Sequence, residues 1–232
     1  MSHDRRDEPR GCASQPCSLH EVEEQRIFPG APGADHPPDP QQRAAIVRWR
    51  KAERERLIAA RLAIPSRARR GLSERIARWL EEAIGNPAGL IVSTYAPFRG
   101  EPGLSGLVAR IMAQGGRHAL PVVVERGKPL VFRAWGPGEP LERGIWNIPQ
   151  PPATADVVLP DVVIAPLVGY DPDCFRLGYG GGYYDRTLAS MPRRPRVFGV
   201  GYSQAAIATI HPLPHDIPMS AIVTESGIIE RP

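Results

Sequence analysis

The chain has few of the features that mark secreted, membrane-bound or redox proteins. Its 232 residues include only three cysteines, and Cys12 and Cys17 do not have the CxxC spacing of zinc or redox sites. No stretch has the apolar length of a membrane span, and the N-terminus has no hydrophobic leader segment. These absences argue against a disulfide scaffold and a membrane protein. We therefore expect a protein of the reduced cytoplasm.

Motifs of several common enzyme classes are also missing. The sequence has no GK[ST] of a Walker A loop, no GxGxxG fingerprint in its usual place, and no Ser-His-Asp or Cys-His nucleophile signature. Aromatic residues make up 6% of the chain and do not cluster with basic residues as they do in RNA-binding proteins. We expect no nucleic-acid partner.

Charge is distributed unevenly along the chain. Residues 1–40 hold seven of the 27 prolines and four arginines against eight acids, whereas the whole chain has a net charge of +4. The first segment has too little apolar surface to offset the entropy of ordering, which predicts a disordered extension. Residues 41–232 then form a single domain with an excess of positive charge, which favours anionic ligands.

Hydrophobic periodicity within that domain predicts an α/β fold. Two amphipathic helices come first, and strands then alternate with helices. The expected helices are 41–63, 66–84, 104–114, 183–191 and a short one at 203–209, and the expected strands are 90–95, 118–124, 130–135, 157–167, 196–201 and 221–224. A Pro-rich connection occupies 136–156. This order predicts a mostly parallel, twisted sheet with helices on both faces.

The most distinctive segment is RLGYGGGYYD, residues 176–185. Its glycines accept positive φ, and successive N–H groups of such a loop form an anion-binding concavity. Arginine suits phosphate oxygens, and Asp185 can hold a hard cation beside them. The alternative is a flexible turn, which three tyrosines and two nearby arginines disfavour. The predicted strand–loop–helix order favours a site for a metal-bound polyphosphate.

Three further segments contain candidate site residues. Glu101 directly follows a predicted strand, Trp146 begins an extended WNIPQP segment, and Asp216 lies in a loop before the last strand. Ligands of such sheets gather at the carboxyl ends of strands, so these residues can converge with the glycine loop. Each also has a structural alternative. Glu101 can be a solvated or helix-capping carboxylate, Trp146 can fill the hydrophobic core, and Asp216 can be a turn residue.

Four arginines of the first predicted helix lie on one stripe. Arg43, Arg50, Arg54 and Arg61 fall close together at 100° per residue, and Leu57 interrupts them. The stripe is therefore either solvated surface charge or part of an anion site.

These motifs resemble the 5-formyltetrahydrofolate cyclo-ligase family, also called 5,10-methenyltetrahydrofolate synthetases. The matching segments are RLGYGGGYYD, YAPFRGEP (95–102), WNIPQP (146–151), PLVGYD (166–171) and LPHD (213–216), and the resemblance covers residues 45–228. It implies a three-layer αβα sandwich of Rossmann-like character. It also implies an enzyme that uses Mg²⁺ and ATP to cyclise 5-formyltetrahydrofolate, with or without a polyglutamate tail. The products are 5,10-methenyltetrahydrofolate, ADP and phosphate, reached through an iminium phosphate. We expect a monomer.

The resemblance also implies roles for individual residues. The implied ATP-binding residues are Arg50, Arg54, Arg176, Leu177, Gly178, Tyr179, Gly180, Gly181, Gly182, Tyr183 and Tyr184. The implied folate-binding residues are Glu101, Trp146, Tyr179, Gly180, Gly181, Gly182 and Tyr183. The implied metal ligands are Asp185 and Asp216, and the implied catalytic residues are Arg176, Tyr183 and Asp185.

Two positions depart from the family pattern. Cys174 stands where a glycine is usual, which predicts a different entrance to the glycine loop, and Ser220 stands where many relatives have an acid. Two other functions therefore stay open: a diverged enzyme for another formylated heterocycle, and a module that binds reduced folates without turnover. Binding alone needs no phosphate cradle, which disfavours the second.

Overall fold

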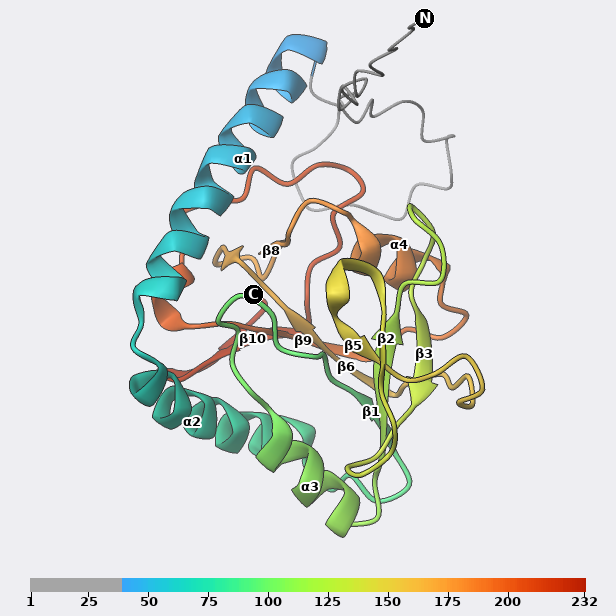
Figure 1. Ribbon diagram of the computed structural model, residues 1–232. Helices are drawn as coiled ribbons and strands as arrows, with labels where there is room; N and C mark the ends of the chain where they lie inside the picture. The colour runs from blue at the N-terminus through green and yellow to red at the C-terminus, as the bar shows by residue number, and fades with distance from the viewer. Residues whose placement is uncertain (1–38) are drawn as a thin grey trace, which may run out of the picture.

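The computed structural model describes residues 39–232 (Figure 1). The predicted disordered extension, residues 1–40, lies outside the described residues except for Asp39 and Pro40. These two residues begin helix α1 (Pro40–Ala63). The Asp39 carboxylate caps the helix by accepting a hydrogen bond from the N–H of Gln42 at 2.8 Å, and Pro40 takes the first helical position, where a missing N–H costs nothing.

A seven-stranded sheet forms the centre of the domain, in the order β11-β10-β9-β6-β1-β2-β3. The strands are β1 (Ile91–Ser93), β2 (Arg117–Val122), β3 (Val131–Ala134), β6 (Val162–Pro166), β9 (Arg196–Val200), β10 (Ala221–Thr224) and β11 (Gly227–Glu230). All neighbouring pairs from β10 to β2 are parallel, and only the edge strands β3 and β11 pair antiparallel. The mostly parallel sheet predicted from the sequence is confirmed.

Helices cover both faces of this sheet (Figure 1). Helices α2 (Ser66–Ile84) and α3 (Ser105–Ala113) pack on one face, against side chains such as Ile164. On the other face Val163 and Ala165 pack in a second cluster with Leu188 of helix α4 (Tyr183–Ser190). Successive strand residues thus point to opposite faces, as buried parallel strands require. The predicted three-layer α/β fold is confirmed.

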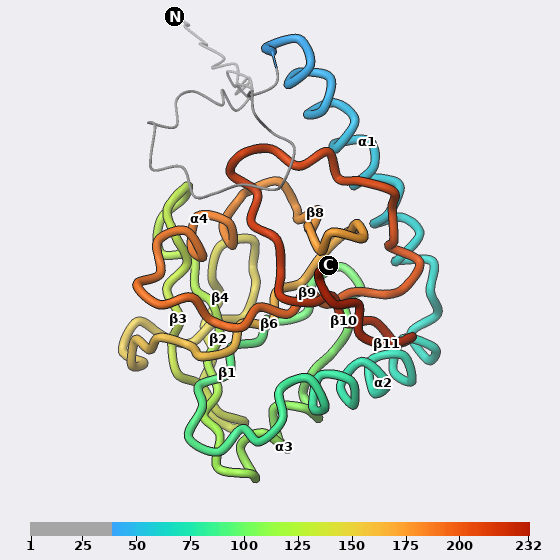
Figure 2. Tube along the Cα trace, turned by 180° about the vertical axis from the view of Figure 1, so that it is seen from behind, coloured from blue at the N-terminus to red at the C-terminus, as the bar shows by residue number. Residues whose placement is uncertain are grey.

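Helix α1 lies outside these layers, across the carboxyl ends of the strands. Its Leu57 and Ile58 pack against Val168 and Phe175, which follow the end of β6. The chain between β9 and β10 passes beside the same helix (Figure 2), where Ile210 joins the cluster. One end of the sheet is therefore framed by α1 and by connecting segments.

Some expected elements differ in the structure. The helix expected at 203–209 is wrong: only a 3₁₀ turn, η2 (Ser203–Ala205), forms there. Beyond it, backbone N–H groups donate instead to Tyr170 and Asp171, so tertiary hydrogen bonds hold the segment extended. Short elements that the sequence did not predict are β4 (Glu142–Arg143), η1 (Ile145–Asn147), β5 (Pro149–Gln150), β7 (Gly169–Tyr170), β8 (Arg176–Leu177) and β11.

No helix in residues 39–232 is both long and apolar enough to cross a membrane.

The order of the strands reverses between β1 and β6. From β1 the chain continues to β2 and β3 on one side, and it then returns to β6 on the other side. The segments that follow β1 and β6 therefore diverge from adjacent carboxyl ends. Open α/β sheets bind ligands in the crevice at such a point.

Candidate active site

The glycine loop lies between the hairpin β7–β8 and the N-terminus of α4. Gly180 and Gly182 have φ values of 97° and 60°, in the left-handed region that favours glycine, and Gly182 is the N-cap of α4. Backbone N–H groups at a helix N-terminus attract anions. The loop thus has the strand–loop–helix setting that the sequence predicted, with a short hairpin in place of a single strand.

Arg54 extends from α1 over this loop. Its Nε donates to the carbonyl oxygen of Gly178 at 2.7 Å, and a Cβ atom on Gly180 would lie 3.5 Å from its Cζ. Burial and the neighbouring Arg50 lower the pKa of Arg54, while Asp216 opposes that shift. Within residues 39–232, this bond from Nε is its only hydrogen bond, so both terminal nitrogens can bind an anion above the loop.

Arg176 of β8 and Asp185 of α4 form a buried ion pair at the two ends of the loop segment. Arg176 Nη2 lies 2.9 Å from Asp185 Oδ2, and the two side chains are 5% and 14% exposed. The guanidinium also lies 5.0 Å from the ring centroid of Tyr184, and its buried Nε has no partner within residues 39–232. Asp185 Oδ1 accepts from the N–H of Ile217 at 3.3 Å. Asp185 therefore connects α4 to the segment that contains Asp216.

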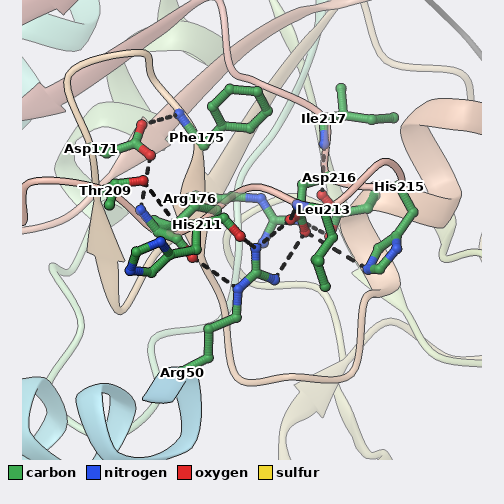
Figure 3. Close-up of polar contacts among 12 residues, drawn as sticks. Arg50, Asp171, Phe175, Arg176, Thr209, His211, Leu213, His215, Asp216 and Ile217 are labelled. Carbon is green, nitrogen blue, oxygen red and sulfur yellow. Dashed lines mark hydrogen bonds and ion pairs between the residues drawn. The ribbon is translucent and has the colours of Figure 1, made fainter. Parts of the chain in front are cut away.

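Arg50 holds that segment from the other side (Figure 3). Its Nε donates to the Ile210 carbonyl at 3.0 Å, and its Nη2 donates to the His211 carbonyl at 2.8 Å. Nη1 and Nη2 also bind the Asp216 carboxylate, with Nη1 3.3 Å from Oδ1. Asp216 Oδ2 accepts in addition from the N–H of Leu213 at 2.6 Å. Arg50 thus joins α1 to residues 210–216, and Asp216 is more than a turn residue.

The two aspartates have the chemistry of a magnesium site. Mg²⁺ is usually bound by one or two carboxylates together with phosphate oxygens and waters. Asp185 bonds to the residue that follows Asp216, so the two carboxylates come from adjoining segments. Both also face arginines, and residues 39–232 contain no group of three or more His, Cys, Asp or Glu side chains suited to a metal. These residues fit a metal that a bound polyphosphate helps to hold.

Glu101 lines an open pocket beside the glycine loop. Its Oε2 accepts from the N–H of Phe98 at 2.8 Å and its Oε1 accepts from the Tyr179 hydroxyl at 3.0 Å, and the residue is only 7% exposed. Burial raises the pKa of Glu101 to about 7, although the bonds from Phe98 and Tyr179 and the charge of Arg61 oppose the shift. The alternative of a solvated carboxylate is excluded.

Arg61 belongs to the same pocket, although the sequence did not single it out as a site residue. It donates from Nε to the Arg99 carbonyl at 3.0 Å, from Nη1 to the Leu167 carbonyl at 3.1 Å, and from Nη2 to the Tyr179 hydroxyl. Arg50 and Arg61 are buried and only Arg43 of the stripe is exposed. The reading of this stripe as solvated charge is therefore wrong for its C-terminal part.

Trp146 lies at the rim of the loop. Its ring centroid is 5.7 Å from that of Tyr183, edge to face, and the tryptophan is 56% exposed. Trp146 and Asn147 both have positive φ, at 57° and 61°, which turns the chain sharply between β4 and β5. Trp146 does not plug the core. All four segments picked out from the sequence thus meet at the carboxyl ends of β1 and β6.

Comparison with known proteins agrees with this geometry. Residues 46–225 match the 5-formyltetrahydrofolate cyclo-ligase family. The chain belongs to this family. A 5-formyltetrahydrofolate cyclo-ligase of Mycolicibacterium smegmatis is 31% identical over 185 residues, which cover 76% of this chain and 94% of the relative. That of Escherichia coli K12 is 34% identical over 148 residues, covering 60% and 80%.

A solved structure of the cyclo-ligase fold confirms the architecture. The structure of Aquifex aeolicus 5,10-methenyltetrahydrofolate synthetase matches with a TM-score of 0.68 at 26% identity, covering 78% of this chain and 92% of that one. The predicted resemblance is confirmed, as are the enzyme class and the link to folate one-carbon chemistry that the family name carries.

The two departures from the cyclo-ligase pattern have local structural consequences. Cys174 adopts a left-handed φ of 62°, with its N–H bonded to the Asp171 carbonyl at 3.0 Å. The turn is thus formed without a glycine, at a cost of about 1 kcal/mol. The different loop entrance expected from Cys174 stays a prediction. The Ser220 hydroxyl accepts from the N–H of Val197 at 3.0 Å and so binds the sheet.

Proposed function

We propose that the protein is an ATP- and Mg²⁺-dependent 5-formyltetrahydrofolate cyclo-ligase. One observation carries this proposal: Tyr179, within the glycine loop, donates to Glu101, which follows β1. The glycine loop, which would bind a polyphosphate, therefore adjoins the Glu101 pocket, which would bind a heterocycle. A shared site is what direct transfer of a phosphoryl group between two substrates requires.

The reaction needs activation of a formamide. Its oxygen is a poor leaving group and its carbon is a weak electrophile. Transfer of the ATP γ-phosphoryl group to the formyl oxygen gives an N5 iminium phosphate and ADP. The N10 amine then attacks the activated carbon and loses its proton to solvent, and the C–O bond breaks to release phosphate and form the methenyl bridge. The protein mainly positions two substrates and stabilises phosphoryl charge.

The arginines of the loop supply that stabilisation. Arg54 binds the Gly178 carbonyl with its terminal nitrogens available, and Arg176 begins the loop segment, oriented by Asp185. Preorganised positive groups aimed at developing charge are a major source of rate enhancement. Mg²⁺, held by Asp185 and Asp216 with phosphate oxygens, would neutralise further phosphate charge. Arg50 acts here through Asp216, which it orients.

The Glu101 pocket orients the second substrate. A buried carboxylate that already accepts from Phe98 and Tyr179 keeps further lone pairs for pterin N–H donors. Trp146 and Tyr183 offer aromatic faces at the rim for a flat ring system. In this role Glu101 orients the pterin ring and does not transfer a proton.

One assay tests the activity. Purified protein is mixed with 5-formyltetrahydrofolate, Mg²⁺ and ATP, and the methenyl chromophore is followed in the near ultraviolet. We expect absorbance that depends on both ATP and Mg²⁺. Absence of the chromophore overturns the proposal. In that case, folate binding without ATP consumption indicates a module that binds reduced folates without turnover. ATP consumption with another formylated heterocycle indicates a diverged enzyme. The expected monomeric state and cytoplasmic location stay predictions, which sedimentation and cell fractionation check.

A further inference from the structure

Arg186, near the start of α4, folds back onto the glycine loop. Its Nη2 donates to the carbonyl oxygen of Gly181, and its guanidinium carbon lies 5.3 Å from the ring centroid of Tyr183. A Cβ atom on Gly182, the N-cap of α4, would lie 2.9 Å from its Nη1. The guanidinium thus lies against the last turn of the loop, where neither the sequence motifs nor the proposed function gives it a role.

Arg186 completes a set of three guanidiniums that approach alternate glycines of the loop. A Cβ atom on Gly178 would lie 2.8 Å from Arg176 Nη1, and one on Gly180 would lie 3.5 Å from Arg54 Cζ. The three arginines come from β8, α1 and α4, so three separate elements place positive charge on one short segment. Because like charges repel, such a convergence is best explained by an anion that the three groups share.

The position of Arg186 does not favour the helix that carries it. A cation near the N-terminus of a helix opposes the macrodipole, which favours an acid there. No carboxylate in residues 39–232 pairs with Arg186, whereas Arg176 is paired with Asp185. The buried Nε of Arg186 also has no hydrogen-bond partner in that range. The contacts with Gly181 and Tyr183 therefore hold the guanidinium in place without neutralising it, and Nε and Nη1 stay available to a ligand.

Arg186 lies on the side of the loop that adjoins the folate rim. The ring of Tyr183, which the guanidinium contacts, has its centroid 5.7 Å from that of Trp146. Arg54 instead lies at the earlier glycines, where it binds the Gly178 carbonyl. A phosphoryl group that passes from a nucleotide to a folate has to occupy the end of the loop nearer the folate. Of the three guanidiniums, that of Arg186 lies at this end.

We propose that Arg186 binds the γ-phosphoryl group of ATP and stabilises it during transfer to the formyl oxygen. The inference rests on the proposed function, because that function supplies both substrates. The P–O bond to ADP breaks as the formyl oxygen bonds to phosphorus, and the negative charge stays spread over the other phosphoryl oxygens. Arg186 donates hydrogen bonds to those oxygens from Nε and Nη1, remains protonated throughout and forms no covalent bond.

The test compares the binding of ADP with that of the non-hydrolysable β,γ-imido analogue of ATP. Dissociation constants are measured by calorimetry with Mg²⁺ for wild type, Arg186→Gln and the control Arg194→Gln. Arg194 is exposed, follows the end of α4 and makes no hydrogen bond or ion pair within residues 39–232. The analogue carries a γ-phosphoryl group and ADP does not, so the ratio of the two constants isolates contacts with that group. Thermal melting confirms that each variant is folded.

We expect wild type and the control to bind the ATP analogue more tightly than ADP. In Arg186→Gln this preference is expected to fall about tenfold, while the affinity for ADP changes by less than about twofold. The kcat of this variant is expected to fall at least about a hundredfold, with little change in the KM for 5-formyltetrahydrofolate.

Two results overturn the inference. Equal losses of affinity for both nucleotides mean that Arg186 only shapes the loop, and an unchanged preference means that it does not reach the γ-phosphoryl group. Formation of the methenyl chromophore by wild type, assayed in parallel, shows whether the proposed function stands when the inference fails. If wild type binds neither nucleotide, both proposals fail.

Discussion

The Tyr179 hydroxyl joins Arg61 to Glu101: it accepts a hydrogen bond from Arg61 Nη2 and donates to Glu101 Oε1 at 3.0 Å. Tyr179 comes from the segment after β6 and Glu101 from the segment after β1, so this chain of bonds crosses the point where the strand order reverses. It couples the geometry of the glycine loop to the protonation of the Glu101 pocket.

Tyr179→Phe tests that coupling. The bond from Tyr179 lowers the pKa of Glu101, which is about 7 in the wild type, so its loss raises this pKa further. If the carboxylate is the form that binds pterin donors, kcat/KM for 5-formyltetrahydrofolate rises with pH through about 7 in wild type. We expect the variant to reach half its maximum at a higher pH and to lose about tenfold in kcat/KM at neutral pH.

The control for this experiment is Tyr170→Phe. The Tyr170 hydroxyl bonds only weakly to the Ser203 carbonyl, at 3.4 Å, away from Glu101. Its pH profile should match that of wild type. An unchanged midpoint in Tyr179→Phe contradicts the proposed coupling.

Glu101→Gln should change the pH dependence of stability. The pKa of Glu101 is raised from 4.5 to about 7 in the folded protein, so folding favours the protonated carboxyl. Its contribution to stability is full below pH 4.5 and is lost as the pH rises to about 7. Above that pH the buried charge costs about 3 kcal/mol.

The amide removes this cost. We therefore expect Glu101→Gln to have a higher free energy of unfolding than wild type at pH 8, and no such advantage at pH 4.5, in urea titrations. The variant should also bind 5-formyltetrahydrofolate more weakly. A stability difference that is the same at both pH values contradicts the raised pKa.

The convergence of Glu101 and the glycine loop was predictable because each follows a recognisable strand, and parallel strands place their carboxyl ends at one edge of the sheet. Asp216 lies in the long connection between β9 and β10, so strand order alone does not fix the edge at which it lies. Arg61 was not predictable in the same way. Its helical stripe fits either solvent or a partner, and only the packing of α1 on residues 167–179 decides between them.

The misplaced helix at 203–209 has a similar cause. Its local sequence suits a helix, but the N–H groups of Ile207 and Ile210 find partners in Tyr170 and Asp171, which are distant in sequence. Tertiary hydrogen bonds therefore outweigh a weak local preference. Two-residue strands such as β7 and β8 are too short for any periodicity to show.

Arg54→Gln should weaken ATP binding selectively. Its Nε bond to Gly178 holds the guanidinium over the loop, and its terminal nitrogens are the groups available to phosphate. We expect the KM for ATP to rise at least about tenfold, with little change in the KM for folate. Arg56→Gln is the control, because Arg56 is exposed and, among the described residues, pairs only with Glu53. Equal effects on both substrates contradict the assignment.

Arg50→Met should destabilise the fold. The side chains of Arg50 and Asp216 are 8% and 10% exposed, so removal of the cation leaves a buried carboxylate without its partner. Breaking such a pair costs about 3–5 kcal/mol. Urea titration should show this loss, whereas exposed Arg48→Met should change stability by less than about 0.5 kcal/mol.

A double variant separates loss of the pair from loss of one partner. In Arg50→Met/Asp216→Leu no buried charge is left unpaired, so the loss should be smaller than in Arg50→Met alone. A double variant that loses the sum of the two single effects contradicts the tethering role of Arg50.

Asp185→Asn tests the metal and the orientation of Arg176 together. The amide keeps the size of the side chain and one oxygen for the Ile217 N–H, but it removes the charge that faces Arg176 at 2.9 Å. We expect kcat to fall at least about a hundredfold, as for loss of a preorganised charged group. The Mg²⁺ concentration for half-maximal activity should rise at the same time, because a ligand of the ion is weakened.

Exposed Asp156→Asn provides the control with the same chemical change. A fall in kcat with unchanged Mg²⁺ dependence means that Asp185 orients Arg176 and does not bind the metal. Wild-type turnover means that Asp185 has neither role, since no other carboxylate in residues 39–232 pairs with Arg176 and could replace it.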